Sequence, residues 1–423
     1  MTATLFLLFP ALLVLGVPYA FSLGIASFLL ALLGPYSASL IVHRVVIGVD
    51  NFLLVAIPMF ILAGNVMERG GISGRLIDLA RAILCRLRGG LPNSLVLAEM
   101  FFSGISGSTV ADISAMSSMV VPSMERAGYR RAYALAIVSA ASAFGILIPP
   151  CILMVVTAAL LNSSVIAVFA ASALPTAVFA VLTMGLVYWQ AARAPAGVAE
   201  GPPLGRAARE AAWALGLPVI IVVGIVTGIA TATEIAVAAV LYAFAVTLFV
   251  YRTLRWRDIP ELLLEAASST GALCLTFGFA TILTYVLARE QVPQMISEWC
   301  LAAFHSPVPL MLLFSLAFLV LGAILEGLPA ALILVPVLWP AAESLGITSL
   351  HFQIVIIAAI GIGLFLPPFG LGLIIAAQVG QEPVERITRD FMPFLAVLLV
   401  GQAIVAAFPI ISNLVPRWLG MQT

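Results

Sequence analysis

The sequence predicts an all-α polytopic membrane protein. Hydrophobic residues make up 63% of the 423 positions, charged residues 9%, and the mean hydropathy is +1.19. Too little polar surface is left to cover a water-soluble body of this length. The apolar segments are continuous runs, such as 213–229 and 310–325, whereas the strands of a membrane barrel alternate in polarity. Since a spanning helix needs roughly 20 apolar residues, the chain has room for about a dozen crossings.

The charged residues and cysteines give no sign of a cofactor, a transition metal or a nucleic acid. Basic and acidic residues number 19 each, so no net charge favours nucleic acid or a soluble acidic partner. The four cysteines stand singly in apolar or interfacial stretches and lack the spacing of metal ligands. We therefore expect no cofactor and no transition metal.

The arginines are clustered, and the clusters predict an orientation. They lie at 69–88, 126–131, 193–209, 252–257 and 386–389. Cytoplasmic loops are enriched in basic residues. The apolar spans between clusters allow all five to face the cytoplasm if segment 91–122 enters and leaves the membrane by the same face. This arrangement places 16 of the 19 arginines inside and predicts a cytoplasmic N-terminus and a periplasmic C-terminus.

A segment rich in proline and glycine, 193–212, divides the chain near its middle. Such composition is typical of a linker. We therefore expect a first half at 1–192 and a second half at 213–423.

The two halves share a spaced pattern of residues. Six positions of the first half recur 218 residues further on with the same residue type, which indicates a duplication. The equivalent loop of the second half, 341–349, carries no basic residue, so the repeats are expected to have inverted topology. The matching positions are Pro122, Glu125, Gly128, Gly145, Pro149 and Pro150, followed by Pro340, Glu343, Gly346, Gly363, Pro367 and Pro368.

Each half contains an apolar segment interrupted by two prolines, at 131–165 and at 351–379. Proline lacks an amide hydrogen and clashes with the preceding turn, so each pair ends one half-helix and can begin the next. The freed carbonyl oxygens suit a hard cation such as sodium, and the amide end of the second half-helix suits an anion. Two ordinary proline kinks are the alternative interpretation.

Two apolar hairpins, at 91–122 and 308–341, carry the other candidate residues. The first is expected to turn through 103–112, where four hydroxyls and a carboxylate lie at the depth of the bilayer core. Polar groups at this depth are costly unless they coordinate something; close packing and helix capping are the alternative. The second hairpin turns near Glu326, a carboxylate that could cap a helix, bind a cation or take up a proton.

Short motifs spread over the whole chain are similar to those of one transporter family. They are 16–21 (GVPYAF), 57–64 (IPMFILAG), 69–73 (RGGIS), 104–108 (GISGS) with 110–112 (VAD), 148–150 (IPP) and 366–371 (LPPFGL). In this combination the chain resembles the large membrane subunit, the DctM-like M subunit, of tripartite ATP-independent periplasmic (TRAP) transporters.

The resemblance implies a permease and not an enzyme. It implies an elevator-type architecture of the ion-transporter superfamily, in which a mobile domain with both hairpins and both broken helices carries the solute. The solute would be an organic anion of the carboxylate, dicarboxylate or sialic-acid class, imported with sodium as the coupling ion. The expected location is the bacterial inner membrane. The expected partners are a separate small four-helix membrane subunit and a periplasmic substrate-binding protein.

The resemblance also assigns candidate site residues. The first sodium site would use Ser103, Gly104, Ser106, Gly107, Ser108, Thr109, Gly145 and Pro149. The second would use Glu326, Gly327, Leu366 and Pro367. The organic anion would lie between them, at Ser108, Asp112, Pro150, Pro368 and Gly370. The family pattern leads us to expect Thr at 366 and Asn at 372, where this chain has Leu366 and Gly372, so its second site would depend more on backbone carbonyls.

Two other functions fit part of the sequence. Residues 104–107 (GISG) match a nucleophile motif of rhomboid-like intramembrane proteases, but such a serine needs a general base, and the nearest downstream histidine is His305. A stand-alone sodium- or proton-coupled anion symporter would share the repeats, hairpins and broken helices. It would need neither a small subunit nor a binding protein.

Overall fold

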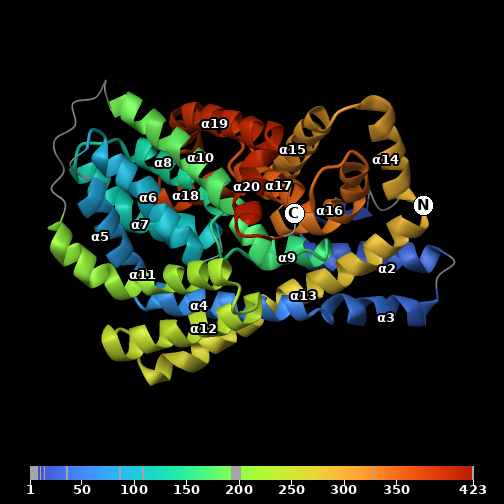
Figure 1. Cartoon of the computed structure of the whole chain (residues 1–423), viewed down its shortest axis with the longest axis horizontal. Helices are drawn as coiled ribbons and strands as arrows, with labels where there is room; N and C mark the ends of the chain where they lie inside the picture. The colour runs from blue at the N-terminus through green and yellow to red at the C-terminus, as the bar shows by residue number, and fades with distance from the viewer. Residues whose placement is uncertain are drawn as a thin grey trace.

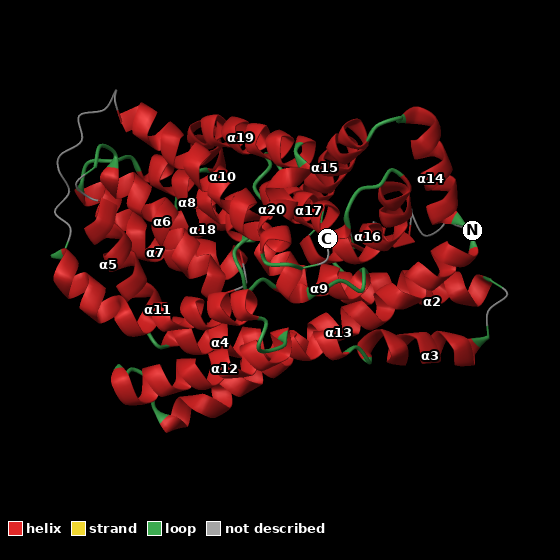
Figure 2. Cartoon of the chain, in the orientation of Figure 1, coloured by secondary structure: helices red, strands yellow, loops and turns green. Residues whose placement is uncertain are grey.

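The part of the chain that the structure describes is built from helices. The computed structural model describes residues 8–9, 11–13, 15–34, 37–84, 87–106, 109–191, 202–325 and 327–421. Every regular element in these ranges is helical (Figure 2). Eight helices of the described part are long and apolar enough to cross a membrane. These findings confirm the predicted all-α polytopic class.

One layer of the molecule consists of long helices along the lower edge of Figure 1. Helix α13 packs against α2, α3 and α4, and α12 packs against α4. Glycines permit this close packing, since a Cβ at Gly24 would lie 2.6 Å from the ring of Phe279. The layer comprises α2 (Tyr19–Leu33), α3 (Ala38–Val49), η1 (Phe52–Val55), α4 (Ala56–Arg69), α11 (Leu204–Thr227), α12 (Ala232–Ala245), η2 (Val246–Val250), η3 (Trp256–Asp258) and α13 (Ile259–Arg289).

The other layer contains two hairpins and two interrupted helices at the places that the sequence suggested. The first hairpin is α6 (Gly90–Ser106) with α7 (Thr109–Arg126), followed by α8 (Arg131–Gly145) and α9 (Ile152–Leu160). The second is α15 (Pro307–Ile324) with α16 (Gly327–Ser344), followed by α17 (Ser349–Gly363) and α18 (Leu371–Gly380). Residues 350–363 of α17 are all buried, as expected of a helix that is apolar on every face. The core therefore lies around the interrupted helices.

Helix ends in the two halves recur at the 218-residue offset of the sequence pattern. Helix α7 begins at Thr109 and α16 at Gly327, while α8 ends at Gly145 and α17 at Gly363. Equivalent stretches of sequence thus form the same local structure. Their opposite orientation in the membrane stays a prediction.

Five further helices surround these elements. Helix α10 packs against α17, α19 and α20, α5 packs between α6 and α11, and α14 packs against α16. Their bounds are α5 (Ile72–Leu84), α10 (Val165–Ala191), α14 (Val292–Ala303), α19 (Val384–Ala407) and α20 (Pro409–Trp418).

The predicted linker is too long at its C-terminal end. Helix α11 begins at Leu204, so residues 204–212 are helical, while 192–201 lie outside the described residues. The prolines and glycines of 193–205 predict a linker, but the alanines within 207–212 favour a helix, because alanine has the highest helix propensity. Pro203 directly precedes the helix, a position that proline tolerates.

Side-chain contacts link residues within or beside the arginine clusters in two groups. The Arg75 guanidinium lies 3.7 Å from the centre of the Tyr251 ring, and the Tyr251 hydroxyl donates a 2.6 Å hydrogen bond to the Glu210 carbonyl oxygen. Arg130 pairs with Asp390 at 2.8 Å. Arg130 also lines a cavity between the beginnings of α6 and α8 and the end of α10. Their place relative to the membrane, and with it the predicted orientation, stays a prediction.

Candidate ion and solute site

Each interrupted helix packs its first half against the hairpin of its own repeat and its second half against the hairpin of the other repeat. Helices α6 and α7 pack against α8, and α15 and α16 pack against α17, so each hairpin contacts the first half of its own interrupted helix. The second halves pack against the opposite hairpin, because α9 contacts α16 and α18 contacts α7. Neither half of the chain completes the centre of this layer alone.

Helices α8 and α17 meet at Ala143 and Gly361. A Cβ at Gly361 would overlap the carbonyl oxygen of Ala143 and would lie 2.6 Å from Cγ2 of Ile146. Only glycine allows this approach, because a backbone carbonyl cannot move aside as the end of a flexible side chain can. The two residues hold equivalent positions in the repeat, so the interrupted helices touch at matching points.

The first hairpin turns more sharply than the sequence predicted. Residues 103–106 continue helix α6 and residues 109–112 already belong to α7, so the expected turn through 103–112 is wrong in its extent. Packing around Ser103 and Asp112, which are both buried, outweighs the weak helix propensity of serine and glycine. Gly104 and Ser106 lie within α6, whereas Gly107 and Ser108 lie outside the described residues.

Two residues predicted for the first sodium site lie together. A Cβ at Gly145 would be 2.7 Å from Ser103 Oγ, so the last turn of α8 is in close contact with α6. Thr109 opens α7 and is half-buried. Asp112, predicted for the solute, is 1% exposed and sits in the first turn of α7, where the helix dipole favours a carboxylate. This position also fits the capping role weighed for Asp112.

Backbone hydrogen bonds already reach several carbonyl oxygens at the first break. The amide of Leu147 donates to Phe144 O at 3.0 Å, the amide of Ile148 donates to Gly145 O at 2.8 Å, and Thr176 Oγ1 donates to Leu147 O at 3.2 Å. Each carbonyl oxygen keeps a second lone pair for another ligand.

The prolines of the two breaks differ in exposure. Pro149 is half-buried and Pro150 is buried, whereas Pro367 is half-buried and Pro368 is exposed. Phe369 follows with 69% of its surface exposed. The second break therefore presents more of its apolar surface to the surroundings than the first.

The second break folds back on itself around Gly370. The Gly370 amide donates to Leu366 O at 2.8 Å and the Gly372 amide donates to Leu364 O at 2.8 Å. A Cβ at Gly370 would lie 2.7 Å from the Leu366 nitrogen, and a Cβ at Gly372 would lie 2.6 Å from the Phe365 ring. The Phe365 ring thus occupies the space in which a side chain at 372 would begin, which accounts structurally for Gly372 in place of the expected Asn.

Gly327 begins α16 and packs closely against neighbouring helices. A Cβ there would lie 2.5 Å from Cγ2 of Ile360 and 3.9 Å from Cδ2 of Leu153. The beginning of α16 therefore packs on α17 and α9, at a point on α17 six residues before Leu366. Glu326 lies outside the described residues.

Sequence reasoning missed Glu99. This residue lies in α6, is 1% exposed, and accepts a 2.5 Å hydrogen bond from Ser142 Oγ of α8. The signal was present in the sequence, since Glu99 stands four residues before Ser103 and therefore on the same helix face.

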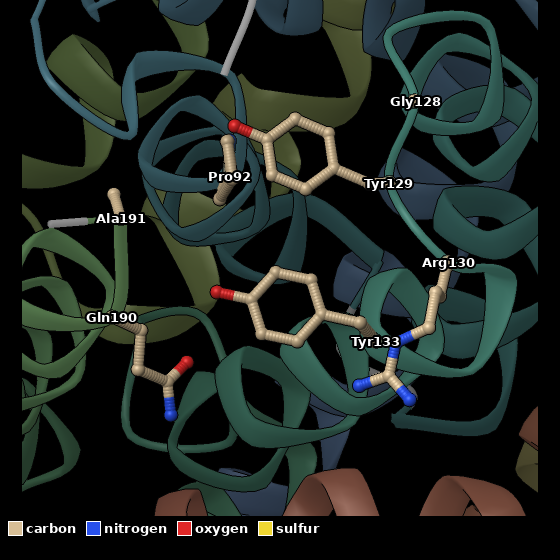
Figure 3. A pocket seen from close by; sticks show the side chains of 7 residues that line it. All are labelled: Pro92, Gly128, Tyr129, Arg130, Tyr133, Gln190 and Ala191. Atoms are coloured by element: carbon tan, nitrogen blue, oxygen red, sulfur yellow. The ribbon is translucent and has the colours of Figure 1, made fainter. Parts of the chain in front are cut away.

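A cavity of about 230 Å³ lies at the arginine-rich end, away from the predicted site residues. Figure 3 shows the Tyr129 and Tyr133 rings side by side on one wall and Gln190 on another; the ring centroids are 6.0 Å apart. The lining residues are Pro92, Gly128, Tyr129, Arg130, Tyr133, Gln190 and Ala191.

The described residues hold no group of three or more His, Cys, Asp or Glu that could bind a metal ion. His351 is buried, with Nδ1 3.2 Å from Ser412 Oγ and Nε2 3.3 Å from Ala406 O. This histidine thus contacts α19 and α20, which gives it a packing role.

Interlocked hairpins and interrupted helices in an apolar all-α chain define a membrane permease. The chain matches the model of the family described as "Tripartite ATP-independent periplasmic transporter, DctM component" over residues 6–411, and it belongs to this family. It is therefore a TRAP transporter large permease, as its motifs indicated, and its relatives are transporters and not enzymes.

Named relatives cover nearly the whole chain. The C4-dicarboxylate TRAP transporter large permease protein DctM of Pseudomonas aeruginosa is 38% identical over 409 residues, which cover 95% of each chain. The sialic acid TRAP transporter large permease protein SiaM of Vibrio cholerae is 33% identical over 412 residues, 96% of each chain. The isethionate TRAP transporter permease protein DctMQ of Oleidesulfovibrio alaskensis is 32% identical over 412 residues, 96% of this chain and 65% of the relative.

A solved structure shares the fold. The YdaH transporter of Alcanivorax borkumensis, whose crystal structure is described as having an unusual topology, superposes with a TM-score of 0.66 over 99% of this chain and 98% of its own. The sequence identity is 17%, so the likeness concerns the fold alone.

Proposed function

We propose that this TRAP large permease imports an organic anion by sodium-coupled secondary transport. The observation that carries the proposal is the exchange of half-helices, in which α9 packs on the second hairpin and α18 on the first. Helices broken at mid-membrane between repeats are the usual place of substrate and ion binding in secondary transporters. Ion binding at one break can therefore change the conformation of the other break, because the two share packing contacts.

The first sodium ion is placed between the end of α6 and the end of α8, on the oxygens of Ser103, Gly104, Ser106, Gly107, Ser108, Thr109 and the Gly145 to Pro149 turn. The contact between Ser103 and Gly145 supports this placement. The second ion is placed between Glu326 and Gly327 and the Leu366 to Pro367 turn. It depends chiefly on backbone oxygen, because Phe365 excludes a side chain at 372.

The solute is proposed to be an organic anion bound near Ser108, Asp112, Pro150, Pro368 and Gly370. The relatives are named for a C4-dicarboxylate, sialic acid and isethionate, all of which are anions near neutral pH. The beginnings of α9 and α18 follow the two breaks, and amide ends of helices attract anions.

Two protein partners complete the proposal. A small membrane subunit is expected on the layer of long helices that includes α2, α3 and α13. The match covers only 65% of the isethionate relative, which therefore has the additional length that a fused partner requires. A periplasmic binding protein is expected to deliver the solute, as in a tripartite system. The arginine-rich end is assigned to the cytoplasm of a bacterial inner membrane, and the layer with both hairpins is assigned the elevator movement.

The decisive experiment is uptake by liposomes that contain this chain and its small subunit. Uptake should require both a sodium gradient and the binding protein. Uptake that ignores sodium would remove the coupling claim. Uptake by this chain alone, without either partner, would favour the stand-alone symporter.

A further inference from the structure

The contact between α6 and α8 consists of two successive pairs of residues. One pair is Glu99 with Ser142, joined by the 2.5 Å hydrogen bond. The next pair, one turn further along both helices, is Ser103 with Gly145. A Cβ at Gly145 would also lie 3.8 Å from Glu99 Oε1, so the carboxylate reaches the second pair. Glu99 therefore borders the proposed first sodium site.

One oxygen of this carboxylate has no partner in the described part of the chain. Oε1 accepts from Ser142, while Oε2 is buried and receives no hydrogen bond from any described residue. A buried carboxylate oxygen without a donor costs several kcal/mol when the group is charged. The side chain is 1% exposed, so bulk water does not offset this cost.

The charge around Glu99 favours a cation. Asp112 interacts electrostatically with Glu99, and both are acidic. The sequence has no basic residue from 89 to 125 or from 132 to 192, which covers α6, α7 and α8 apart from their arginine-rich ends. A cation bound near the two carboxyl groups would offset both their repulsion and the cost of burying their charge.

We propose that Glu99 supplies the negative charge of the first sodium site, with Oε2 directed to the ion. Ser142 holds the carboxylate through Oε1, and Gly145 keeps α8 close enough for Ser103 and Glu99 to share one ligand. One carboxylate oxygen with hydroxyl and carbonyl oxygens suits a monovalent hard cation, since Ca²⁺ sites generally use more carboxylate ligands. The inference rests on the proposed sodium coupling.

The test is direct sodium binding to the purified permease with its small subunit. Thermal stability is titrated with NaCl at constant ionic strength, using choline chloride as the balancing salt. The unmodified chain should show saturable stabilisation. Glu99→Gln, which keeps the shape and removes the charge, should weaken the apparent sodium affinity tenfold or more. Glu125→Gln is the matched control, because Glu125 pairs with Arg131 at the arginine-rich end, and it should bind sodium as the unmodified chain does.

Unchanged sodium affinity in Glu99→Gln would overturn the inference, since it would mean that the carboxyl group is neutral. If Glu99→Gln fails to fold, Glu99→Asp replaces it; the charge is kept but withdrawn by one methylene, and affinity should fall at least threefold, with unchanged affinity again overturning the idea. If the unmodified chain binds no sodium and transports without it, the proposed coupling itself fails. These outcomes separate the two claims.

Discussion

Gly361 of α17 lies directly against the carbonyl oxygen of Ala143 in α8, and the two residues are 218 positions apart. The same offset relates the helix ends and the paired prolines of the two halves. Contact between equivalent positions is what a two-fold axis through this point would produce. The paired prolines of each break begin six residues after the crossing, so the crossing sets the spacing of the two proposed ion sites.

Replacing Gly361 with alanine should destabilise the protein. The new methyl group would overlap the Ala143 carbonyl oxygen, and overpacking of this kind costs about 1–3 kcal/mol. Thermal unfolding in detergent measures the loss. Gly74→Ala is the control, because a Cβ there meets nothing within 4 Å. Equal stability of the two variants would show that α8 and α17 can separate without cost.

Gly145→Ala should weaken sodium-dependent uptake about tenfold, an effect on the order of 1.4 kcal/mol. The added Cβ would lie 2.7 Å from Ser103 Oγ and would push α8 from α6. Sodium titration of solute uptake in liposomes gives the apparent affinity. Gly185→Ala in α10, with open space around its Cβ, should leave the titration unchanged; a similar loss there would point to general damage.

Gly372→Asn should not restore a side-chain ligand, because the Phe365 ring lies 2.6 Å from the position of the new Cβ. We expect a loss of about 1–3 kcal/mol in stability from this crowding. Adding Phe365→Leu should return part of it, so the two substitutions should be coupled in a double-mutant cycle. Additive effects would contradict the assigned contact.

Replacing both Pro149 and Pro150 with alanine should abolish transport but allow membrane insertion. Alanine restores the amide hydrogens and favours a continuous helix across the break. Uptake in liposomes and membrane fractionation measure the two properties. Pro218→Ala, within α11 of the outer layer, is expected to transport normally. Full uptake by the double variant would count against the first break as a site.

The ion pairs of Arg69 and Arg130 at the arginine-rich end should differ in their contribution to the free energy of unfolding. Arg69 pairs with Glu261 at 3.0 Å and also with Glu265, and these two carboxylate side chains are 63% and 43% exposed, so Arg69→Ala should cost less than about 1 kcal/mol. Arg130 pairs with Asp390, whose side chain is only 10% exposed. Arg130→Ala leaves this carboxylate without its cation and should cost about 1–3 kcal/mol. Thermal unfolding at low and high salt compares the two, and the reverse order would refute the assignment.

Much of the fold was predictable because membrane helices have a recognisable pattern in the local sequence. Continuous apolar runs gave the fold class, and the repeated prolines gave the two interrupted segments. The extents of the helices were harder to predict, because packing extends α6 through the serines and glycine of 103–106, which locally favour a turn. Helix α11 begins at Leu204, inside the expected linker.

The candidate site was only partly predictable. The pairing of Ser103 with Gly145 followed from the motifs, but Glu99 gains its importance from Ser142, 43 residues later in the chain. Likewise, the Phe365 ring excludes a side chain at Gly372 only because the second break folds back on itself, and no residue pattern predicts this conformation. The residue periodicity of a single segment does not show which distant segments it will contact.

The exchange of half-helices also bears on how the chain matures. Helix α9 has nine residues, too few to cross a bilayer or to be stable alone, and its partner α16 begins more than 160 residues later. During synthesis the first half therefore enters the membrane with α9 lacking its final neighbour. The centre of the permease can therefore be completed only after the second hairpin has been synthesised.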